Sequence, residues 1–245
     1  MIRKPLAVFL ELVLAVGVYL VVAAAMTWPA VRHMDEVVIG SGELGGWLWR
    51  QWWHFQEVGA LGSSESLGML DRLQALVGLG RFPETGNILD LLILDYPLEQ
   101  ALGFPWHHNL KVLVILVGNG VCGYALARTQ TTSTVVALTA GTVAVINPLV
   151  IQDVNKTGLR QVLLWWLLLY PVVLERAGRT GKMRDGALAG AMFAMTSAFY
   201  WFYGVFAAMY SVIWLIGWWL RRRLQPWATL RWMSAATVTA AVGLG

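Results

Sequence analysis

Residues 5–27 read PLAVFLELVLAVGVYLVVAAAMT, an apolar run in which Glu11 is the one charged residue. A helix rises about 1.5 Å per residue, so this run is long enough to cross a hydrocarbon core of roughly 30 Å. Residues 28–108 follow and are rich in acids, and closely spaced apolar runs come after them. Because further runs follow, we expect the first one to be an uncleaved anchor rather than a signal peptide.

The composition places the chain among membrane proteins. Of its 245 residues, 58% are hydrophobic and 13% are charged, which is about half the usual charged fraction. A soluble domain of this size could not bury so much apolar surface. We therefore predict an all-α polytopic membrane protein that forms a single membrane domain over residues 1–245. The lone Cys122 excludes an intrachain disulfide.

Apolar runs after the first predict about seven transmembrane helices in all. Residues 186–220 carry no charge, and as one helix they would measure roughly 52 Å, too long for one crossing. We expect two short helices there, joined by a turn near residues 197–204. A seventh run is still in progress at Gly245, which suggests the N-terminal part of a longer protein. The predicted spans after the first are residues 110–127, 135–151, 159–174, 186–198, 204–220 and 231–245.

Charge sets the orientation of this bundle. Residues 28–108 hold ten of the fourteen acids, all four histidines and four arginines, and the remainder is strongly basic. The basic groups stand at the ends of the runs, which indicates membrane orientation and no nucleic-acid partner. The N-terminus is then cytoplasmic and residues 28–108 form a large extracytoplasmic loop. Two short amphipathic helices, near residues 46–58 and 67–77, are expected to lie on the membrane surface.

Carboxylates of this loop are the candidate catalytic groups. Asp35 and Glu36 follow soon after the first run, and Glu43 stands in a glycine-rich segment. A carboxylate near the lipid headgroups could deprotonate a sugar hydroxyl, or hold a divalent cation such as Mg or Mn against a phosphate. Asp95 could supply a second carboxylate. The alternatives are ordinary solvated acids and, for Glu43, a charge that favours the start of the helix at Gly46.

Other polar residues suggest a phosphate clamp but no zinc site. Arg160 and Lys156 lie in the second exported loop, where basic groups could bind an anionic phosphate. The histidines lack the spacing of zinc ligands. Glu11 lies inside the first run, near its inner end, and we expect it to pair with Arg3, Lys4 or a neighbouring helix. The aromatic residues 199–203 are expected to form a membrane-interface belt, with sugar stacking as the alternative.

Several short motifs stand in a fixed order along most of the chain. They are Thr27-Trp28-Pro29, then Gly42-Glu43 ahead of Trp49 and Trp53, then Gly118-Asn119-Gly120 through Arg128, then Ala140-Gly141 up to Asn147-Pro148, and finally Ser197–Gly204. Together they resemble motifs of bacterial multi-pass proteins of the GT-C glycosyltransferase superfamily. This chain has Glu43 where the closest pattern has Asp. The pair Asp35-Glu36 instead resembles the Asp-Glu pair of protein O-mannosyltransferases.

The resemblance implies a GT-C-like bundle in the bacterial cytoplasmic (inner) membrane. Such enzymes take a sugar from a polyprenyl-phosphate carrier and pass it to an acceptor outside the cytoplasm, using an acid of the first loop. On this view Glu43 is the favoured base or metal ligand, and the partners are a polyprenyl-phosphate-linked sugar and membrane lipid. Two alternatives are a transporter or flippase component and a non-catalytic assembly partner. Transporters usually carry polar residues at mid-membrane depth in two related halves of the chain. The predicted spans show little charge at that depth, and the sequence shows no such halves, which disfavours transport.

Overall fold

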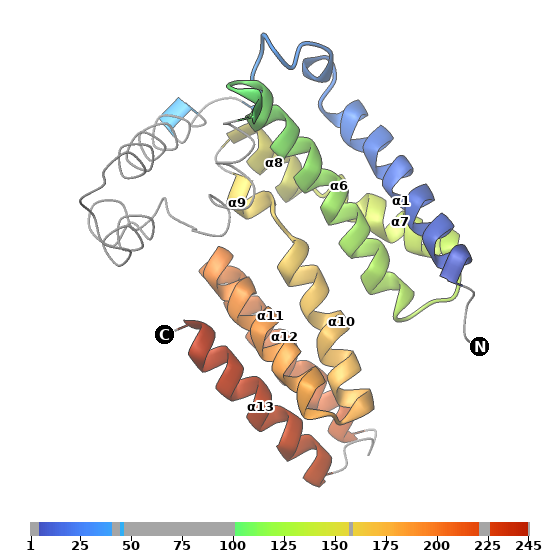
Figure 1. Cartoon of the computed structure of the whole chain (residues 1–245), viewed down its shortest axis with the longest axis vertical. Helices are drawn as coiled ribbons and strands as arrows, with labels where there is room; N and C mark the ends of the chain where they lie inside the picture. The colour runs from blue at the N-terminus through green and yellow to red at the C-terminus, as the bar shows by residue number, and fades with distance from the viewer. Residues whose placement is uncertain (1–4, 41–44, 47–100, 157–158, 221–225, 245) are drawn as a thin grey trace. The chain divides into compact units, whose positions relative to one another are not determined.

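The computed structural model describes residues 5–40, 45–46, 101–156, 159–220 and 226–244, and these residues form helices joined by short connections (Figure 1). No strand occurs within those ranges. Four segments among them are long and apolar enough to cross a membrane, which confirms, for the described residues, an all-helical architecture with several candidate spans. These segments are Leu6–Met26, Trp106–Arg128, Thr134–Asn155 and Trp201–Leu220.

The helix boundaries agree with most of the predicted spans and refine them. The described elements are α1 (Pro5–Met26), the 3-10 helix η1 (Ala30–Arg32), α6 (Trp106–Arg128), α7 (Thr134–Val145), α8 (Pro148–Lys156), α9 (Leu159–Val162), α10 (Trp165–Thr180), α11 (Met183–Phe199), α12 (Trp201–Leu220) and α13 (Pro226–Leu244). The prediction of two helices within residues 186–220 is confirmed. They are separated at Tyr200, which is extended with φ −155° and ψ 113°.

Two predicted spans differ from the structure for local reasons. The predicted third span is divided between α7 and α8, because Pro148 disfavours a helical backbone at the residue before it, Asn147. The predicted fourth span contains the short α9 and then α10, which continues past Pro171 to Thr180. The predicted helices at 46–58 and 67–77 lie outside the described residues, apart from Gly46.

Residue contacts divide the chain into two compact units. One comprises Met1–Ala23, Leu116–Asn147 and Leu163–Gly245. The other comprises Ala24–Ile115 and Pro148–Val162. Each unit has its own packing, and the candidate carboxylates Asp35 and Glu36 belong to the second.

In the first unit, Tyr19 joins three helices. Its side chain is fully buried, and its hydroxyl donates a hydrogen bond to the Leu138 carbonyl on α7 at 3.3 Å. A Cβ on Gly120 or on Gly141 would overlap the Tyr19 ring or its hydroxyl. Both glycines are therefore needed for α1, α6 and α7 to approach this closely around the tyrosine.

Glu11 pairs with α6, which confirms the expectation that it has a partner. Its Oε2 accepts hydrogen bonds from the Tyr124 hydroxyl at 2.8 Å and from Arg128 Nη2 at 3.2 Å. Arg128 also donates to the Thr131 carbonyl at 3.3 Å. A carboxylate inside an apolar helix is costly to bury without such partners, so these bonds hold the N-terminal half of α1 against α6.

Helices α10 to α13 form a second group within the first unit, in which α11 contacts the other three. A Cβ on Gly186 would overlap the Trp232 carbonyl, and one on Gly190 would overlap the Ala236 carbonyl. These two small residues, four apart on α11, allow the backbone of α13 to pack directly against it. Small residues at this spacing are typical of close helix packing in membranes.

The turn between α10 and α11 is basic and contains one buried acid. The Asp185 side chain is 2% exposed, accepts a hydrogen bond from the Thr180 hydroxyl at 2.6 Å, and lies 3.1 Å from Arg176 Nε. The Thr180 hydrogen bond and the nearby Arg176 charge lower the pKa of Asp185 despite the opposing effect of burial. Arg176, Arg179, Lys182 and Arg184 are exposed around it. We call these four residues the basic rim.

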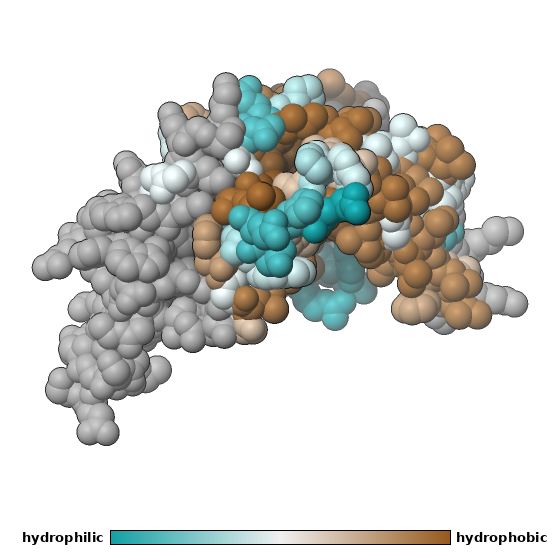
Figure 2. All heavy atoms as spheres, turned by 90° about the horizontal axis from the view of Figure 1, so that it is seen from above, coloured by the Kyte–Doolittle hydropathy of each residue, from teal (hydrophilic) through white to brown (hydrophobic). Residues whose placement is uncertain are grey.

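Apolar side chains cover much of the described surface (Figure 2). Val21 on α1 is 71% exposed, and Ile213 on α12 is 67% exposed. Soluble proteins rarely leave apolar surface of this extent in contact with water. The exposed faces of α1 and α12 therefore match the lipid contact expected of candidate membrane spans.

Candidate functional site

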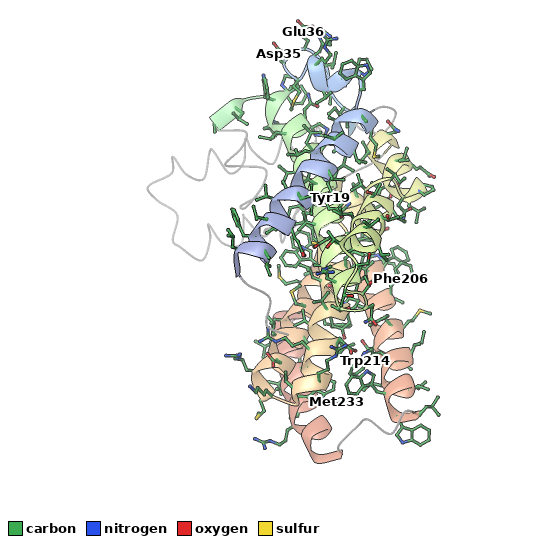
Figure 3. The ribbon with its side chains drawn as sticks, turned by 90° about the vertical axis from the view of Figure 1, so that its right-hand side faces the viewer. Tyr19, Asp35, Glu36, Phe206, Trp214 and Met233 are labelled. Carbon is green, nitrogen blue, oxygen red and sulfur yellow. The ribbon has the colours of Figure 1, made fainter. Side chains whose placement is uncertain are left out.

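Asp35 and Glu36 lie on a tight turn that follows α1 and η1. The backbone N–H groups of Glu36 and Val37 donate to the His33 carbonyl at 3.1 and 2.9 Å, which closes the turn. Both acidic side chains are exposed (Figure 3). We call residues 33–37 the carboxylate turn. It presents two adjacent carboxylates to the surroundings, as a general base or a cation ligand would require.

Two buried apolar residues lie on either side of the acidic residues of this turn. Met34 is 8% exposed and Ile39 is 5% exposed, whereas Asp35, Glu36 and Val37 between them are exposed. This alternation of buried and exposed residues follows from the sequence. Burial of the apolar side chains lowers the free energy, and so does hydration of the acids. The turn is consequently held at both ends, and its acidic tip is left accessible.

Asn109, in the first turns of α6, fixes the backbone of the same loop. Its side chain is fully buried, and its Nδ2 donates to the carbonyls of Met34 at 2.9 Å and Val37 at 2.6 Å. Its Oδ1 accepts a hydrogen bond from the Ile39 N–H at 2.8 Å. One amide side chain therefore makes hydrogen bonds to three backbone groups of the loop. We call this arrangement the Asn109 clamp.

His108 adds a fourth bond to the clamped loop. Its Nε2 lies 3.1 Å from the Ile39 carbonyl, and its side chain is 2% exposed. A carbonyl oxygen can only accept a hydrogen bond, so Nε2 carries the proton in this contact. The sequence spacing already disfavours the histidines as zinc ligands, and in the structure His108 instead makes a hydrogen bond to the backbone of Ile39.

Basic side chains lie within and beside the carboxylate turn. His33 Nδ1 is 3.4 Å from Glu36 Oε2, and both side chains are more than half exposed. The Arg32 guanidinium lies over the Trp28 ring, 5.2 Å from its centroid. An indole beside an arginine is typical of the boundary between lipid and water. This pairing agrees with a position at headgroup depth.

The other predicted site residues cannot be grouped with Asp35 and Glu36. Glu43 and Asp95 lie outside the described residues. Lys156 ends α8 and Arg160 lies in α9, but the structure does not describe their side chains. A site that joins these four residues to the carboxylate turn therefore remains a prediction. Within the described ranges, no three His, Cys, Asp or Glu side chains gather as a metal would require.

The sequence analysis missed Asn109 and the role of His108. Both residues directly precede the apolar run that starts at Leu110, at the point where the chain returns from the long loop. Polar amide and imidazole groups at the entrance of a span need partners once they are buried. That need was a usable signal, although it could not reveal that the partners are residues 34–39.

Comparisons with known proteins give no relative: no family model, no curated protein and no solved structure matches this chain. Several of the described residues in the motifs that resemble the GT-C superfamily have a packing role in the structure. A Cβ on Gly118 would overlap Trp165, and one on Gly204 would overlap the Ser197 hydroxyl. Asn119 Oδ1 accepts a hydrogen bond from the Leu164 N–H at 2.9 Å.

Proposed function

We propose that this protein is an integral membrane glycosyltransferase of GT-C type, which transfers a sugar from a polyprenyl-phosphate carrier to an acceptor on the extracytoplasmic side. The carboxylate turn is the observation that carries the proposal. Its two acids follow the first candidate span directly, and the Asn109 clamp holds them on α6. A lipid-linked donor needs this geometry, because its reacting group stays at the headgroup while its tail remains in the bilayer.

The proposed reaction needs one base and one site for a phosphate. A loop carboxylate removes the proton of the acceptor hydroxyl, whose oxygen attacks the anomeric carbon. The bond from that carbon to the phosphate oxygen breaks, and polyprenyl phosphate leaves. Glu43 is the favoured base or cation ligand, with Asp35 and Glu36 as alternatives and Asp95 as a second carboxylate. Arg160 and Lys156 are the candidate phosphate ligands.

The test is a transfer assay with the purified protein, a tritium-labelled polyprenyl-phosphate mannose and the matching glucose donor. Glu43→Gln should lower transfer by about 10²–10⁴-fold, the usual contribution of a general base, while leaving membrane insertion intact. The double variant Asp35→Asn/Glu36→Gln is the parallel test of the carboxylate turn. Glu65→Gln, in the same loop and outside the proposed site, is the matched control.

The outcomes separate the assignments from one another. Full activity of Glu43→Gln together with loss of activity in the double variant would transfer the catalytic role to Asp35 or Glu36. Full activity of both variants would exclude all three acids as the base. If the unmodified protein releases no sugar from either donor, the transferase proposal is contradicted, and transport or an assembly role would have to replace it.

A further inference from the structure

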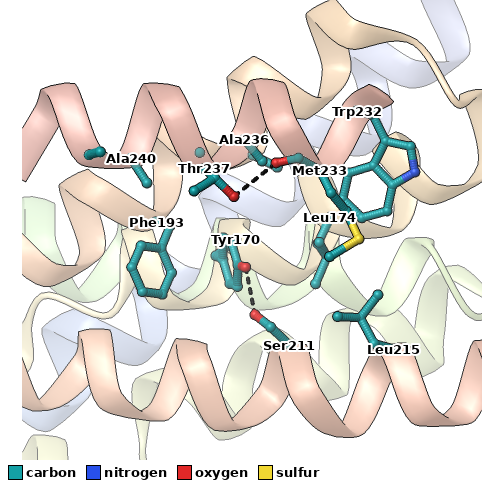
Figure 4. A pocket seen from close by; sticks show the side chains of 13 residues that line it. Tyr170, Leu174, Phe193, Ser211, Leu215, Trp232, Met233, Ala236, Thr237 and Ala240 are labelled. Atoms are coloured by element: carbon teal, nitrogen blue, oxygen red, sulfur yellow. Dashed lines mark hydrogen bonds between the residues drawn. The ribbon is translucent and has the colours of Figure 1, made fainter. Parts of the chain in front are cut away.

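A groove of about 390 Å³ lies between α12 and α13, and α10 and α11 form its floor (Figure 4). Tyr170 and Phe193 line the floor, Ser211 and Leu215 line one wall, and Ala240 belongs to the opposite wall. The volume falls within the range of small-molecule sites, about 300–1,000 Å³. The whole groove lies within one unit of the chain.

The hydroxyl groups that line the groove already have hydrogen-bond partners. The Ser211 hydroxyl donates to the Ala207 carbonyl at 2.6 Å, so the Tyr170 hydroxyl donates to Ser211 in their 2.6 Å contact. The Thr237 hydroxyl donates to the Met233 carbonyl at 3.0 Å. The donor hydrogens of these hydroxyls are therefore already used within the protein, and the groove is otherwise lined by apolar side chains, which favours a hydrocarbon ligand.

Trp232 lines one end of the groove, and Trp214 packs against it. The Trp214 and Trp232 rings meet edge to face with centroids 6.1 Å apart. Trp214 Nε1 donates to Glu175 Oε2 at 2.8 Å, and Glu175 Oε1 accepts from Arg179 Nε, also at 2.8 Å. Contacts from Trp232 through Trp214 and Glu175 therefore connect this end of the groove to Arg179 of the basic rim, where a phosphate headgroup would find cations.

The depth of the groove matches the tails of the adjacent leaflet. Ser211 and Leu215 lie about 8–14 Å from the end of α12 at Leu220, at about 1.5 Å per residue. Met233 and Ala240 lie about 10–21 Å from the start of α13 at Pro226. Half of a hydrocarbon core is about 15 Å thick. Measured from these helix ends, the groove covers about the length of the acyl chains of one leaflet.

We propose that this groove binds one acyl chain of a phospholipid from the leaflet on the side of the basic rim. The bound lipid would fill the space between α12 and α13, which pack on α10 and α11, and its phosphate would lie near Lys182 and Arg184. This site is distinct from the proposed transfer site, whose donor reacts beside the carboxylate turn. The inference does not require that the protein be a transferase.

The test is photo-crosslinking of the full chain in nanodiscs with a phosphatidylglycerol that carries a diazirine in the middle of one acyl chain. We expect crosslinks on the α13 segment 233–241. Ala240→Phe should lower them about tenfold or more, which corresponds to about 1.4 kcal/mol of lost affinity. Val238→Phe is the matched control, since Val238 is 63% exposed and does not line the groove; it should leave the crosslinks unchanged.

Ala241→Phe, at a more exposed position of the same wall, gives a second variant in case Ala240→Phe fails to fold. Loss of crosslinks in a folded groove variant, judged by thermal unfolding, supports the proposal. Crosslinks unchanged in that variant would overturn it, as would the absence of crosslinks in the unmodified protein. Displacement of the probe by polyprenyl phosphate but not by unlabelled phosphatidylglycerol would also overturn it. The groove could instead hold a second copy of the chain. A dimer that Ala240→Phe disrupts would show this and would also overturn the proposal.

Discussion

Asn109 bonds to Ile39, seventy residues earlier in the chain, and its three hydrogen bonds determine where the carboxylate turn lies. Removal of its side chain would take away the hydrogen-bond partner of the Ile39 N–H and of the Met34 carbonyl, both on buried residues. An unsatisfied buried polar group costs about 1–3 kcal/mol. The consequence should be local, because Met34 and Ile39 would still be buried against apolar neighbours.

For Asn109→Ala we predict faster hydrogen exchange at the Ile39 amide, by about tenfold to a hundredfold, because its acceptor is lost. Gln130→Ala is the control, since the Gln130 amide makes an exposed hydrogen bond to Thr129. Exchange at Ile39 that stays at the level of the control would show that the Asn109 clamp does not hold the loop.

The Asp185 carboxylate should make the free energy of unfolding sensitive to acid. Its pKa in the folded protein is lower than its ordinary value of 3.8, because Thr180 and Arg176 favour the charged form. Stability from this carboxylate is therefore complete above about pH 4 and is lost as the pH falls through the lower folded value. Asp185 directly precedes the predicted span that starts at Gly186, and its neighbours Lys182 and Arg184 are exposed.

Thermal unfolding from pH 6 to pH 3 should reveal this contribution. We expect Asp185→Asn to be less stable than the unmodified protein at pH 6 and to lose less stability on acidification. Thr180→Val, which removes the hydrogen bond but keeps the acid, should fall between the two. Parallel pH curves for all three proteins would contradict the role assigned to Asp185.

At the scale of elements, the contact between α11 and α13 depends on Gly190. For Gly190→Ala we predict a loss of about 1–3 kcal/mol in unfolding free energy, since the new Cβ would overlap the Ala236 carbonyl and force α13 away. Gly217→Ala is the same change in α12, where a Cβ meets nothing within 4 Å. It should be neutral or stabilise by about 0.5–1 kcal/mol. Equal unfolding temperatures of the two variants would refute this packing.

Hydropathy and charge predict the elements well because both are local properties of the sequence. The boundaries of α1 and the two helices of residues 186–220 follow from run length and the bilayer thickness. The start of α6 at Trp106 could not be predicted in this way, because His107, His108 and Asn109 are polar. Their burial depends on tertiary contacts, and hydropathy cannot register such contacts.

The candidate site is less predictable than the helices for a related reason. The sequence identifies Asp35 and Glu36 as acids next to a span, but not the turn that exposes both of them. That turn depends on Asn109, and the pairing of residues so far apart leaves no local pattern. The positions of Glu43, Asp95, Lys156 and Arg160 around it likewise depend on long-range contacts, so their grouping stays a prediction.

For the whole molecule, the charge distribution of the sequence predicts the membrane topology. Acids gather in residues 28–108, and basic residues gather at the ends of α10 and α11 and in residues 221–223. By the positive-inside rule we predict that the basic rim is cytoplasmic and that the carboxylate turn is extracytoplasmic. The transferase proposal requires this separation, because its acceptor is extracytoplasmic.

The most direct test labels single cysteines in intact cells with a membrane-impermeant maleimide. Glu36→Cys and Arg184→Cys, both exposed positions, are each placed in a Cys122→Ser background. The account predicts that Glu36→Cys is labelled in intact cells and that Arg184→Cys is labelled only after permeabilisation. Labelling of both from the same side, or of Arg184→Cys alone in intact cells, would contradict it.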